Sequence, residues 1–490
     1  MNLFYTDISG SIAIFLIALD IGLRIAALLI IPNNRRPSSA AAWLLAIFFI
    51  PVLGVIAFWL IGSPKLPKKR RQKQAYITAE IRKLTENAVT INDEIPAPNW
   101  LLLVAKLNAN LGAMPLVGGN RADLVEGYEN SFKSMAKDIL KAKDFVNVGF
   151  YIMSLDKTTK DFFNALVGAH KKGVKVRVLF DHVGSLQYPD YKKTVKFLND
   201  AGIDWHLMLP VQPLKGKFQR PDLRNHRKIL VCDGTVGYTG SQNIIDKSYN
   251  KKKNIKKGIY WKELMVRVEG LAATELNGLF ASDWYAETDE NIISPSKNIL
   301  SRVRDYGDVD CQVIPSGPGF DSENNLKLFN SLMYNAQKDI IISSPYFVPE
   351  ESMLMALTTA SERGVNVELF VSEIGDQFMV YHAQRSYYET LLRAGVKIFL
   401  YKSPAVLHAK HMTIDNKVSI IGSSNMDIRS FGLNMEVTAM FHSEDFANRM
   451  HAVEASYRSS SKKLHLKDWV NRPYRQKVVD NLARLTSALQ

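Results

Sequence analysis

Two long apolar runs open the chain, covering residues 8–31 and 40–62. Each is long enough to cross the hydrocarbon core of a bilayer, which needs about 20 apolar residues. We therefore expect two apolar helices in residues 1–62, which either span a membrane, making the protein multi-pass, or re-enter it. A cleaved signal peptide is the alternative for the first run, but no basic segment precedes that run and a second run follows it.

One pair of charges interrupts the first run. Asp20 and Arg24 are four residues apart, so a helix places them on one face. An ion pair is costly inside a lipid bilayer, and we therefore expect this pair to contact another helix.

Beyond residue 98, amphipathic helices alternate with short apolar strands, and the pattern occurs twice. "FKSMAKDILKAKDFVNVGFYIMSLD" is similar to "LKLFNSLMYNAQKDIIISSPYFVPE", and "KKGVKVRVLFD" to "ERGVNVELFVS", where Gly173 and Gly364 mark helix ends. Helices alternating with strands predict an α/β fold with a largely parallel sheet and some antiparallel additions. We expect two similar α/β halves, residues 99–300 and 301–490, related by a pseudo-two-fold axis.

The charge of the chain narrows the choice of partners. A formal net charge of +14 favours anionic partners, either nucleic acid or anionic lipid. Residues 63–98 form a basic linker, in which six of the nine residues 65–73 are Lys or Arg. Lys- and Arg-rich segments beside a membrane helix remain in the cytoplasm, so this linker predicts that the two halves are cytoplasmic. Arg35 and Arg36, between the apolar runs, favour the opposite orientation.

A set of polar residues recurs inside both halves. "NHRKILVCDGTVGYTGSQN" begins at residue 225 and "LHAKHMTIDNKVSIIGSSN" begins at residue 407, so equivalent positions are 182 residues apart. The shared residues are His226, Lys228, Asp233, Ser241 and Asn243 in the first copy and His408, Lys410, Asp415, Ser423 and Asn425 in the second.

The apolar segments around each aspartate predict a β-hairpin. Asp233-Gly234 is typical of a two-residue turn, which would set His226 opposite Ser241, and the second copy predicts the same arrangement. Alternation along the strand puts the histidine and the lysine of each copy on one face. We expect Asp233 and Asp415 to hold the turns through hydrogen bonds to backbone groups.

This set of residue types suits a phosphoryl group. Lysine supplies positive charge, serine and asparagine supply neutral donors, and histidine can be a nucleophile or a proton carrier. Displacement at a phosphodiester needs an attacking group on one side and a proton donor on the other. We therefore expect both copies to build one site that needs no metal or other cofactor. Cys232 and Cys311 lack metal-ligand spacing and are expected to be free thiols.

The pattern HxKxxxxD followed by GSxN, present twice, resembles the phospholipase D superfamily over most of residues 110–490. Four further segments are similar to the bacterial cardiolipin synthases. These segments are "AAWLLAIFFIPVLGVIAFWLIGSPK", "FDHVGS", "SSPYFVPEE" and "SNMDIRSFGLNMEV".

The resemblance implies a metal-independent transfer in the bacterial inner membrane, in which two phosphatidylglycerol molecules become cardiolipin and glycerol. The catalytic set that it implies is His226, Lys228, Asp233, His408, Lys410 and Asp415. One histidine forms a phosphatidyl-enzyme and the other protonates the departing glycerol; we expect His226 to be the nucleophile on the resemblance alone. The implied partners are phosphatidylglycerol and other anionic phospholipids, with no nucleic acid, and a homo-oligomer is compatible with the sequence.

Two carboxylates are candidates for orienting the histidines. Glu263 and Glu436 each begin a strand after their motif, and a carboxylate bonded to one ring nitrogen fixes the tautomer of an imidazole. The alternative is a surface glutamate at a strand start, and the family more often has Asp at the position of Glu263. The other histidines that we considered, His182, His382 and His411, match nothing in the repeat and are expected to be bystanders.

Two basic stretches, "KGKFQRPDLRNHRK" and "DKSYNKKKNIKK", flank the first motif. They either hold anionic headgroups or form solvated loops. A hydrolase or nuclease of the same superfamily is the alternative enzyme, and it differs in using water to resolve the intermediate. A catalytically inactive membrane scaffold is the alternative from another class, but such a protein has no reason to keep both motifs.

Overall fold

The computed structural model describes residues 10–33, 35, 37–63, 65–85, 97–215, 217–293 and 306–485. The chain divides into two compact units, residues 1–65 and 66–490, and each is considered by itself. The expected boundary between the two α/β halves, at residue 300, lies outside the described residues, as does part of the expected linker.

The N-terminal unit contains three apolar helices where two were expected. They are α1 (Gly10–Ile30), α2 (Pro37–Phe49) and α3 (Pro51–Ile61). Among the described helices, only α1 is long and apolar enough to cross a membrane, over Ile12–Ile30. A multi-pass protein is therefore not supported among the described helices, and crossing or re-entry of the second apolar run stays a prediction from the sequence. Proline lacks a backbone N–H and disfavours helix at the preceding residue, so Pro51 divides the second apolar run into two short helices.

Close packing holds the short helices together. A Cβ atom on Gly54 of α3 would lie 2.8 Å from the Cα atom of Ile47 in α2, so only glycine permits this approach. The ion pair of α1 lies beside α2: Arg24 Nε is 2.7 Å from Asp20 Oδ2, and its guanidinium donates to the Phe48 carbonyl at 3.1 Å. The expected contact of this ion pair with another helix is confirmed.

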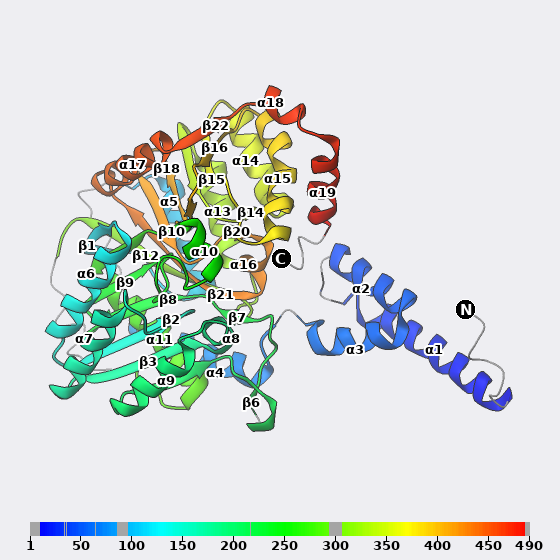
Figure 1. The fold of residues 1–490 in the computed structure, drawn as a ribbon, viewed down its shortest axis with the longest axis horizontal. Coiled ribbons are helices and arrows are strands. Elements are labelled where there is room, and N and C mark those ends of the chain that lie inside the picture. The colour runs from blue at the N-terminus through cyan, green and yellow to red at the C-terminus, as the bar shows by residue number, and fades with distance from the viewer. Residues whose placement is uncertain are drawn as a thin grey trace. The chain divides into compact units, whose positions relative to one another are not determined.

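One 16-stranded sheet runs through the larger unit, and each half contributes the same strand order (Figure 1). Across the first half the strands are β1 (Val117–Val125), β11 (Met265–Glu269), β9 (Val236–Gly240), β8 (Lys228–Cys232), β2 (Phe145–Phe150), β3 (Lys175–Asp181) and β4 (Asp204–Met208). Across the second they are β12 (Val309–Ser316), β21 (Asn434–His442), β19 (Val418–Gly422), β18 (His411–Ile414), β13 (Asp339–Ser343), β15 (Asn366–Ser372) and β16 (Lys397–Tyr401), followed by an additional edge strand β22 (Ser461–Leu464). The expected pair of similar α/β halves is confirmed.

The sheet is mixed, and the expectation that it is largely parallel is wrong. Parallel pairing joins β2 to β3 and β3 to β4, and likewise β13 to β15 and β15 to β16. The motif hairpins and the central pair of β1 with β12 are antiparallel. The helix-connected strands of each half are therefore parallel, and the segments after them add antiparallel strands.

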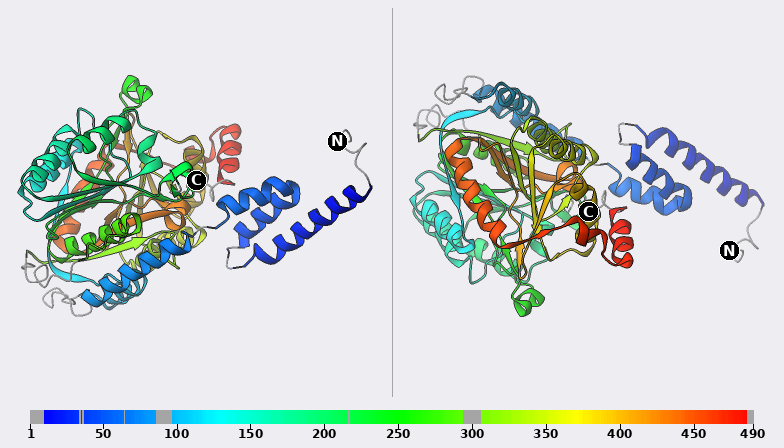
Figure 2. Two further views of the ribbon diagram at one scale, coloured as in Figure 1. Left: turned by 90° about the horizontal axis from the view of Figure 1, so that it is seen from below. Right: turned by 90° about the horizontal axis from the view of Figure 1, so that it is seen from above.

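Helices cover both faces of the sheet (Figures 1 and 2). In the first half they are α6 (Tyr128–Lys141), α7 (Lys160–Lys171), α9 (Tyr191–Asp200) and α11 (Leu271–Thr288), and in the second α13 (Asn324–Asn335), α14 (Glu351–Glu362), α15 (Phe378–Arg393) and α17 (Glu444–Ser459). Gly173 and Gly364 follow α7 and α14 with φ of 88° and 96°, as expected of helix ends.

A shared hydrophobic core joins the two halves. It contains Val266 and Phe280 of the first half together with Val437 and Phe446 of the second. Ile77 of α4 (Lys68–Thr85) is buried in the same core, so the described part of the basic segment 63–98 includes a packed helix. This continuous core fixes the two motifs relative to each other.

Both motif hairpins differ by one residue from the expected register. Cys232 pairs with Val236, and Ile414 pairs with Val418, so three residues form each turn. Asp233 and Gly234 adopt left-handed conformations with φ of 54° and 74°, and the Thr235 N–H closes the turn on the Cys232 carbonyl at 3.2 Å. Thr235 is therefore an extra residue before the strand pairing resumes, and the register that would oppose His226 to Ser241 is wrong.

Candidate active site

Each motif histidine is held by backbone of the other half. β7 (Arg224–Asn225) runs parallel to the start of β21, and the His226 N–H donates to the Met435 carbonyl at 2.8 Å. Equivalently, β17 (Ala405–Leu407) runs parallel to β10 (Tyr260–Lys262), and the His408 N–H donates to the Lys262 carbonyl at 2.8 Å. Neither histidine could be placed by its own half alone.

Each half also supplies the carboxylate that binds the motif histidine of the other half. His226 Nδ1 lies 3.0 and 3.1 Å from the two carboxylate oxygens of Glu436. His408 Nδ1 lies 2.8 Å from both carboxylate oxygens of Glu263. Both glutamates are buried, so neither is the surface residue of the alternative reading. A carboxylate at Nδ1 favours the tautomer whose Nε2 carries the free lone pair.

Each motif lysine contacts the backbone carbonyl of its own motif histidine. Lys228 Nζ donates to the His226 carbonyl at 2.5 Å, and Lys410 Nζ donates to the His408 carbonyl at 2.7 Å. Burial holds the pKa of Lys228 well below its usual value and lowers the pKa of Lys410 to about 8. An incoming phosphate would favour the charged form of both ammonium groups.

The two histidine–glutamate pairs differ electrostatically. Burial raises the pKa of Glu436 to about 7, whereas the nearby His408 and Lys410 overcome the effect of burial and hold the pKa of Glu263 below its usual value. Burial, together with the charges of Lys228, Lys410 and His408, lowers the pKa of His226 well below its usual value. Burial also lowers the pKa of His408, but the Glu263 carboxylate opposes that shift. His226 of the first motif and Ser423 of the second bind the same Glu436 carboxylate, so the two motifs lie next to each other.

The motif serines and asparagines contact the carboxylates and the backbone around the histidines. Ser423 Oγ donates to Glu436 Oε2 at 2.5 Å, and Ser241 Oγ accepts from the Leu264 N–H at 3.0 Å. Asn243 Nδ2 donates to the Tyr249 hydroxyl at 3.0 Å, which donates to Glu263 Oε1 at 3.2 Å. The buried Asn425 Oδ1 has no hydrogen-bond partner among the described residues. Three of these four polar side chains therefore have protein partners around the histidines.

The two motif aspartates bind backbone, as expected. The Asp233 carboxylate accepts hydrogen bonds from the N–H groups of Lys143, Asp144 and Phe145 at 2.9–3.0 Å. The Asp415 carboxylate accepts from the N–H groups of residues 337, 338 and 339 at 2.7–3.1 Å. Each aspartate ties a motif turn to the start of the neighbouring strand.

Replacing Asp233 with asparagine should therefore reduce stability more than chemistry. Asparagine keeps the left-handed backbone accessible but removes the charge that strengthens three hydrogen bonds, so we expect to lose about 1–3 kcal/mol of unfolding free energy. Thermal unfolding in detergent measures this, with the exposed Asp321→Asn as the control. Loss of activity in Asp233→Asn with an unchanged unfolding midpoint would instead indicate a direct role in the reaction.

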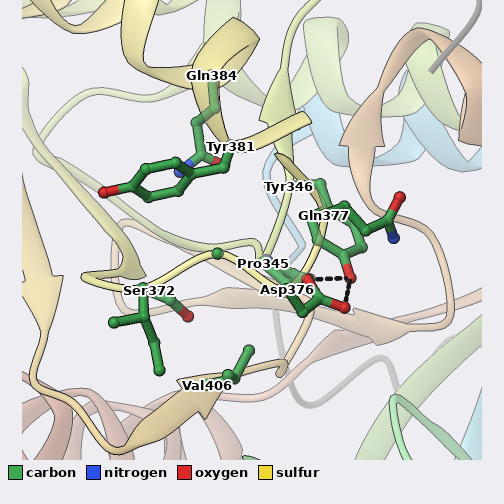
Figure 3. Close-up of a pocket in the computed structure, with 10 residues that line it drawn as sticks. Pro345, Tyr346, Ser372, Asp376, Gln377, Tyr381, Gln384 and Val406 are labelled. Atoms are coloured by element: carbon green, nitrogen blue, oxygen red, sulfur yellow. Dashed lines mark hydrogen bonds between the residues drawn. The ribbon is translucent and has the colours of Figure 1, made fainter. Parts of the chain in front are cut away.

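Sequence reasoning missed two tyrosines beside the histidines. The Tyr151 ring lies 4.9 Å from the His226 ring, and the Tyr346 ring lies 6.2 Å from the His408 ring. The signal was present, because the repeat aligns "GFYIM" with "SPYFV" and so pairs the two tyrosines. The Tyr346 hydroxyl donates to both Asp376 carboxylate oxygens at 2.9 Å and lines a small pocket of about 10 Å³ (Figure 3). A pocket of that size has room for about one water molecule.

A buried ion pair also holds the first motif and was not expected. Asp181 Oδ1 lies 3.1 Å from Arg224 Nη1, and Asp181 Oδ2 accepts from the Asn225 N–H at 3.0 Å. In the second half the Ser372 hydroxyl takes the equivalent position and accepts a hydrogen bond from the Leu407 N–H at 2.8 Å. Both groups therefore bind the residue that precedes a motif histidine.

The three other histidines considered in the sequence, His182, His382 and His411, have contacts of their own. His182 Nδ1 accepts from the Val211 N–H at 3.1 Å, and His382 Nδ1 lies 2.7 Å from Asp480. His411 is buried 3.6 Å from the Glu454 carboxylate. Within the described ranges, no group of three or more His, Cys, Asp or Glu side chains is arranged to hold a metal ion.

Comparison with known proteins agrees with this geometry. A family model described as "Cardiolipin synthase, PLD-like domain" matches residues 135–284 and 329–455, and one described as "Phospholipase_D-nuclease N-terminal" matches residues 22–63. The structure of phosphatidylserine synthase from Haemophilus influenzae has the same fold, with a TM-score of 0.57 and 14% identity, covering 79% of this chain and 98% of that one. The fold and site define a phospholipase D-like protein with two motif-bearing halves.

Curated relatives narrow the family further. The chain is 33% identical to cardiolipin synthase A of Proteus mirabilis, with full coverage of both chains. It is 34% identical to cardiolipin synthase A of Wigglesworthia glossinidia brevipalpis, covering 93% of this chain and 92% of that one. The chain belongs to the cardiolipin synthase family, and it is a membrane-associated phosphatidyltransferase.

Proposed function

We propose that this protein transfers a phosphatidyl group from one phosphatidylglycerol to another, giving cardiolipin and glycerol. The observation that carries the proposal is the exchange of carboxylates, in which Glu436 binds His226 and Glu263 binds His408. The exchange builds two oriented imidazoles into one site, together with two buried lysines. These are the groups that a two-step displacement at phosphorus requires.

In the first step, His226 Nε2 attacks phosphorus of the first lipid and the bond from phosphorus to the glycerol oxygen breaks. The departing glycerol oxygen takes a proton from His408. In the second step, His408 accepts the proton of a hydroxyl group on the second phosphatidylglycerol. That oxygen then attacks phosphorus and the phosphorus–nitrogen bond to His226 breaks, which returns both histidines to their starting states.

The electrostatics support this division of roles. A nucleophilic imidazole must be neutral, and the pKa of His226 lies well below its usual value because the side chain is buried near several cations. A general acid must carry a proton; burial lowers the pKa of His408 below its usual value, but the carboxylate of Glu263 opposes that shift and so favours His408 over His226 as the proton carrier. Lys228 and Lys410 would neutralise the phosphate oxygens, with no need for a metal ion.

The acceptor distinguishes this function from hydrolysis, because water would yield phosphatidic acid from the same intermediate. The apolar N-terminal unit favours a lipid acceptor, since it keeps the site at a membrane where lipid hydroxyls are abundant. The basic residues 65–73 support a cytoplasmic location of the catalytic unit at the bacterial inner membrane. A homo-oligomer stays a prediction from the sequence.

The test is to incubate the full-length protein with phosphatidylglycerol alone, in detergent micelles with an excess of EDTA. We expect cardiolipin and glycerol in equal amounts, measured by mass spectrometry and an enzymatic glycerol assay. Phosphatidic acid as the main product would favour the hydrolase. Loss of turnover in EDTA that one divalent ion restores would contradict metal independence.

A further inference from the structure

A basic groove lies away from the motif histidines, at one edge of the larger unit. It has a volume of about 640 Å³, within the range of small-molecule sites. The start of α4, the strand β4, the segment after it and the end of α11 form its walls. The walls include no motif residue, so the groove is separate from the candidate active site.

Positive charge dominates the groove lining. Its cations are Lys69, Arg70, Lys73 and Lys215, and its one carboxylate is Glu287. That carboxylate is already occupied, because one oxygen lies 2.8 Å from Arg70 Nη2 and the other accepts from the Leu209 N–H at 2.8 Å. Lys73 is paired with Asp289 at 2.6 Å, whereas Lys69 and Lys215 are exposed and form no ion pair with a carboxylate among the described residues. The groove can therefore accept an anion without breaking an existing ion pair.

The apolar part of the lining belongs to the edge of the sheet, because Trp205, Leu207 and Pro210 lie on β4 or directly after it. The Trp205 ring stacks on Phe180 with ring centroids 5.4 Å apart and its indole N–H donates to Asn199 at 2.8 Å, so it packs with Leu207 on the core of the first half. Neighbouring residues of a strand point to opposite faces, and His206, which contacts Trp284 of α11, points to the face that α11 and α4 cover. The basic side chains therefore define the ligand of the groove, and a phosphate group suits them.

The position of the groove in the chain points to the source of that ligand. Only residues 62–66 separate the end of α3 at Ile61 from Pro67, which lines the groove. Lysine and arginine side chains that directly follow an apolar segment at a membrane are attracted to anionic headgroups. Lys69, Arg70 and Lys73 are such side chains, and the fold gathers them with Lys215 from a distant part of the chain.

We propose that this groove binds the phosphate headgroup of an anionic phospholipid, as a second lipid site in addition to the catalytic one. A free phosphate ion has the same charged chemistry, but the direct chain connection between the apolar helix α3 and the groove favours a lipid. Phosphatidylglycerol is the probe of the lipid, and inorganic phosphate is the probe of the free ion.

The two native cysteines make a direct test feasible. Cys232 and Cys311 are both buried, so Gln212→Cys in the groove lining adds one accessible thiol. The full-length protein also carries His226→Ala, so that phosphatidylglycerol is not consumed. In dodecyl maltoside micelles, the rate of alkylation by the neutral reagent N-ethylmaleimide is measured as phosphatidylglycerol is added, with phosphatidylcholine and inorganic phosphate as separate arms.

We expect phosphatidylglycerol to slow alkylation at least about fivefold, while phosphatidylcholine has no effect. Protection should disappear in Lys69→Ala/Lys215→Ala and persist in Lys462→Ala/Lys463→Ala. The control lysines are exposed on β22, at the opposite end of the sheet from β4, and their removal subtracts the same charge.

Equal protection by phosphatidylcholine, or undiminished protection in Lys69→Ala/Lys215→Ala, would overturn the proposal. Absence of protection by phosphatidylglycerol would also overturn it, and protection by inorganic phosphate alone would assign the groove to the free ion. These readouts do not depend on turnover, so they can fail while the proposed transfer stands.

Discussion

Replacing His226 with alanine should abolish the covalent phosphatidyl-enzyme, whereas replacing His408 should block turnover and still permit the enzyme to be labelled. Both single variants should lose at least about 10³-fold in turnover of phosphatidylglycerol, because each removes a group that acts on the reacting bonds. The labelling difference arises because a substrate with a good leaving group needs no proton from His408.

The measurement uses a phosphatidyl ester of a nitrophenol with a radiolabelled acyl chain. After denaturation, we expect an acid-labile and base-stable label in His408→Ala and none in His226→Ala. The reverse pattern would exchange the roles of the histidines and preserve the two-step mechanism. Label in both variants would remove the assigned mechanism and require direct attack of one lipid on the other.

The exchanged carboxylates give the second prediction. Replacing Glu436, which lies in the second half, with glutamine should impair the histidine of the first half. The amide of glutamine can donate to His226 Nδ1, which moves the ring proton to Nε2 and removes the nucleophilic lone pair. We expect turnover to fall about 10²-fold or more, and the labelling of Glu436→Gln to fall with it. Glu263→Gln should lose turnover similarly and keep its labelling, because it acts on His408.

The pH profile separates positioning from mere structural support. The pKa of Glu436 is raised to about 7, so kcat/KM should rise as the pH increases through about 7 and the carboxylate ionises. Glu436→Gln should lack this limb of the profile. Glu275→Gln is the matched control, because Glu275 is also buried and its pKa is well above its usual value. An unchanged profile in Glu436→Gln, or labelling lost in Glu263→Gln instead, would contradict the exchanged pairing.

Several features of the fold and site could be predicted from local patterns. The repeat predicted two similar halves, and the matching offsets of the two motifs predicted which side chains share a site. Pro51 was a readable signal that the second apolar run breaks, since proline acts on its own backbone and on the residue before it. The pair of tyrosines beside the histidines could also have been predicted, from the alignment of the two halves.

Other features depend on contacts between distant parts of the chain. The extra residue in each hairpin accompanies hydrogen bonds that Asp233 accepts from residues 143–145 and Asp415 accepts from residues 337–339. These long-range bonds cannot be inferred from the turn propensity of the hairpin residues. The buried pair of Asp181 and Arg224 joins the end of one strand to the start of the motif, and nothing in either segment specifies the other.

The sequence by itself determined the residue types of the site, their spacing and their duplication, because these follow from the order of residues along each half. Only the tertiary structure decided that Glu436 serves His226 and Glu263 serves His408, across separations of 210 and 145 residues. The reason is physical: the central pairing of β1 with β12 and the shared core bring the start of β21 beside β7 and the end of β10 beside β17. Two symmetric motifs leave the partner of each histidine open until the packing of one half against the other selects it.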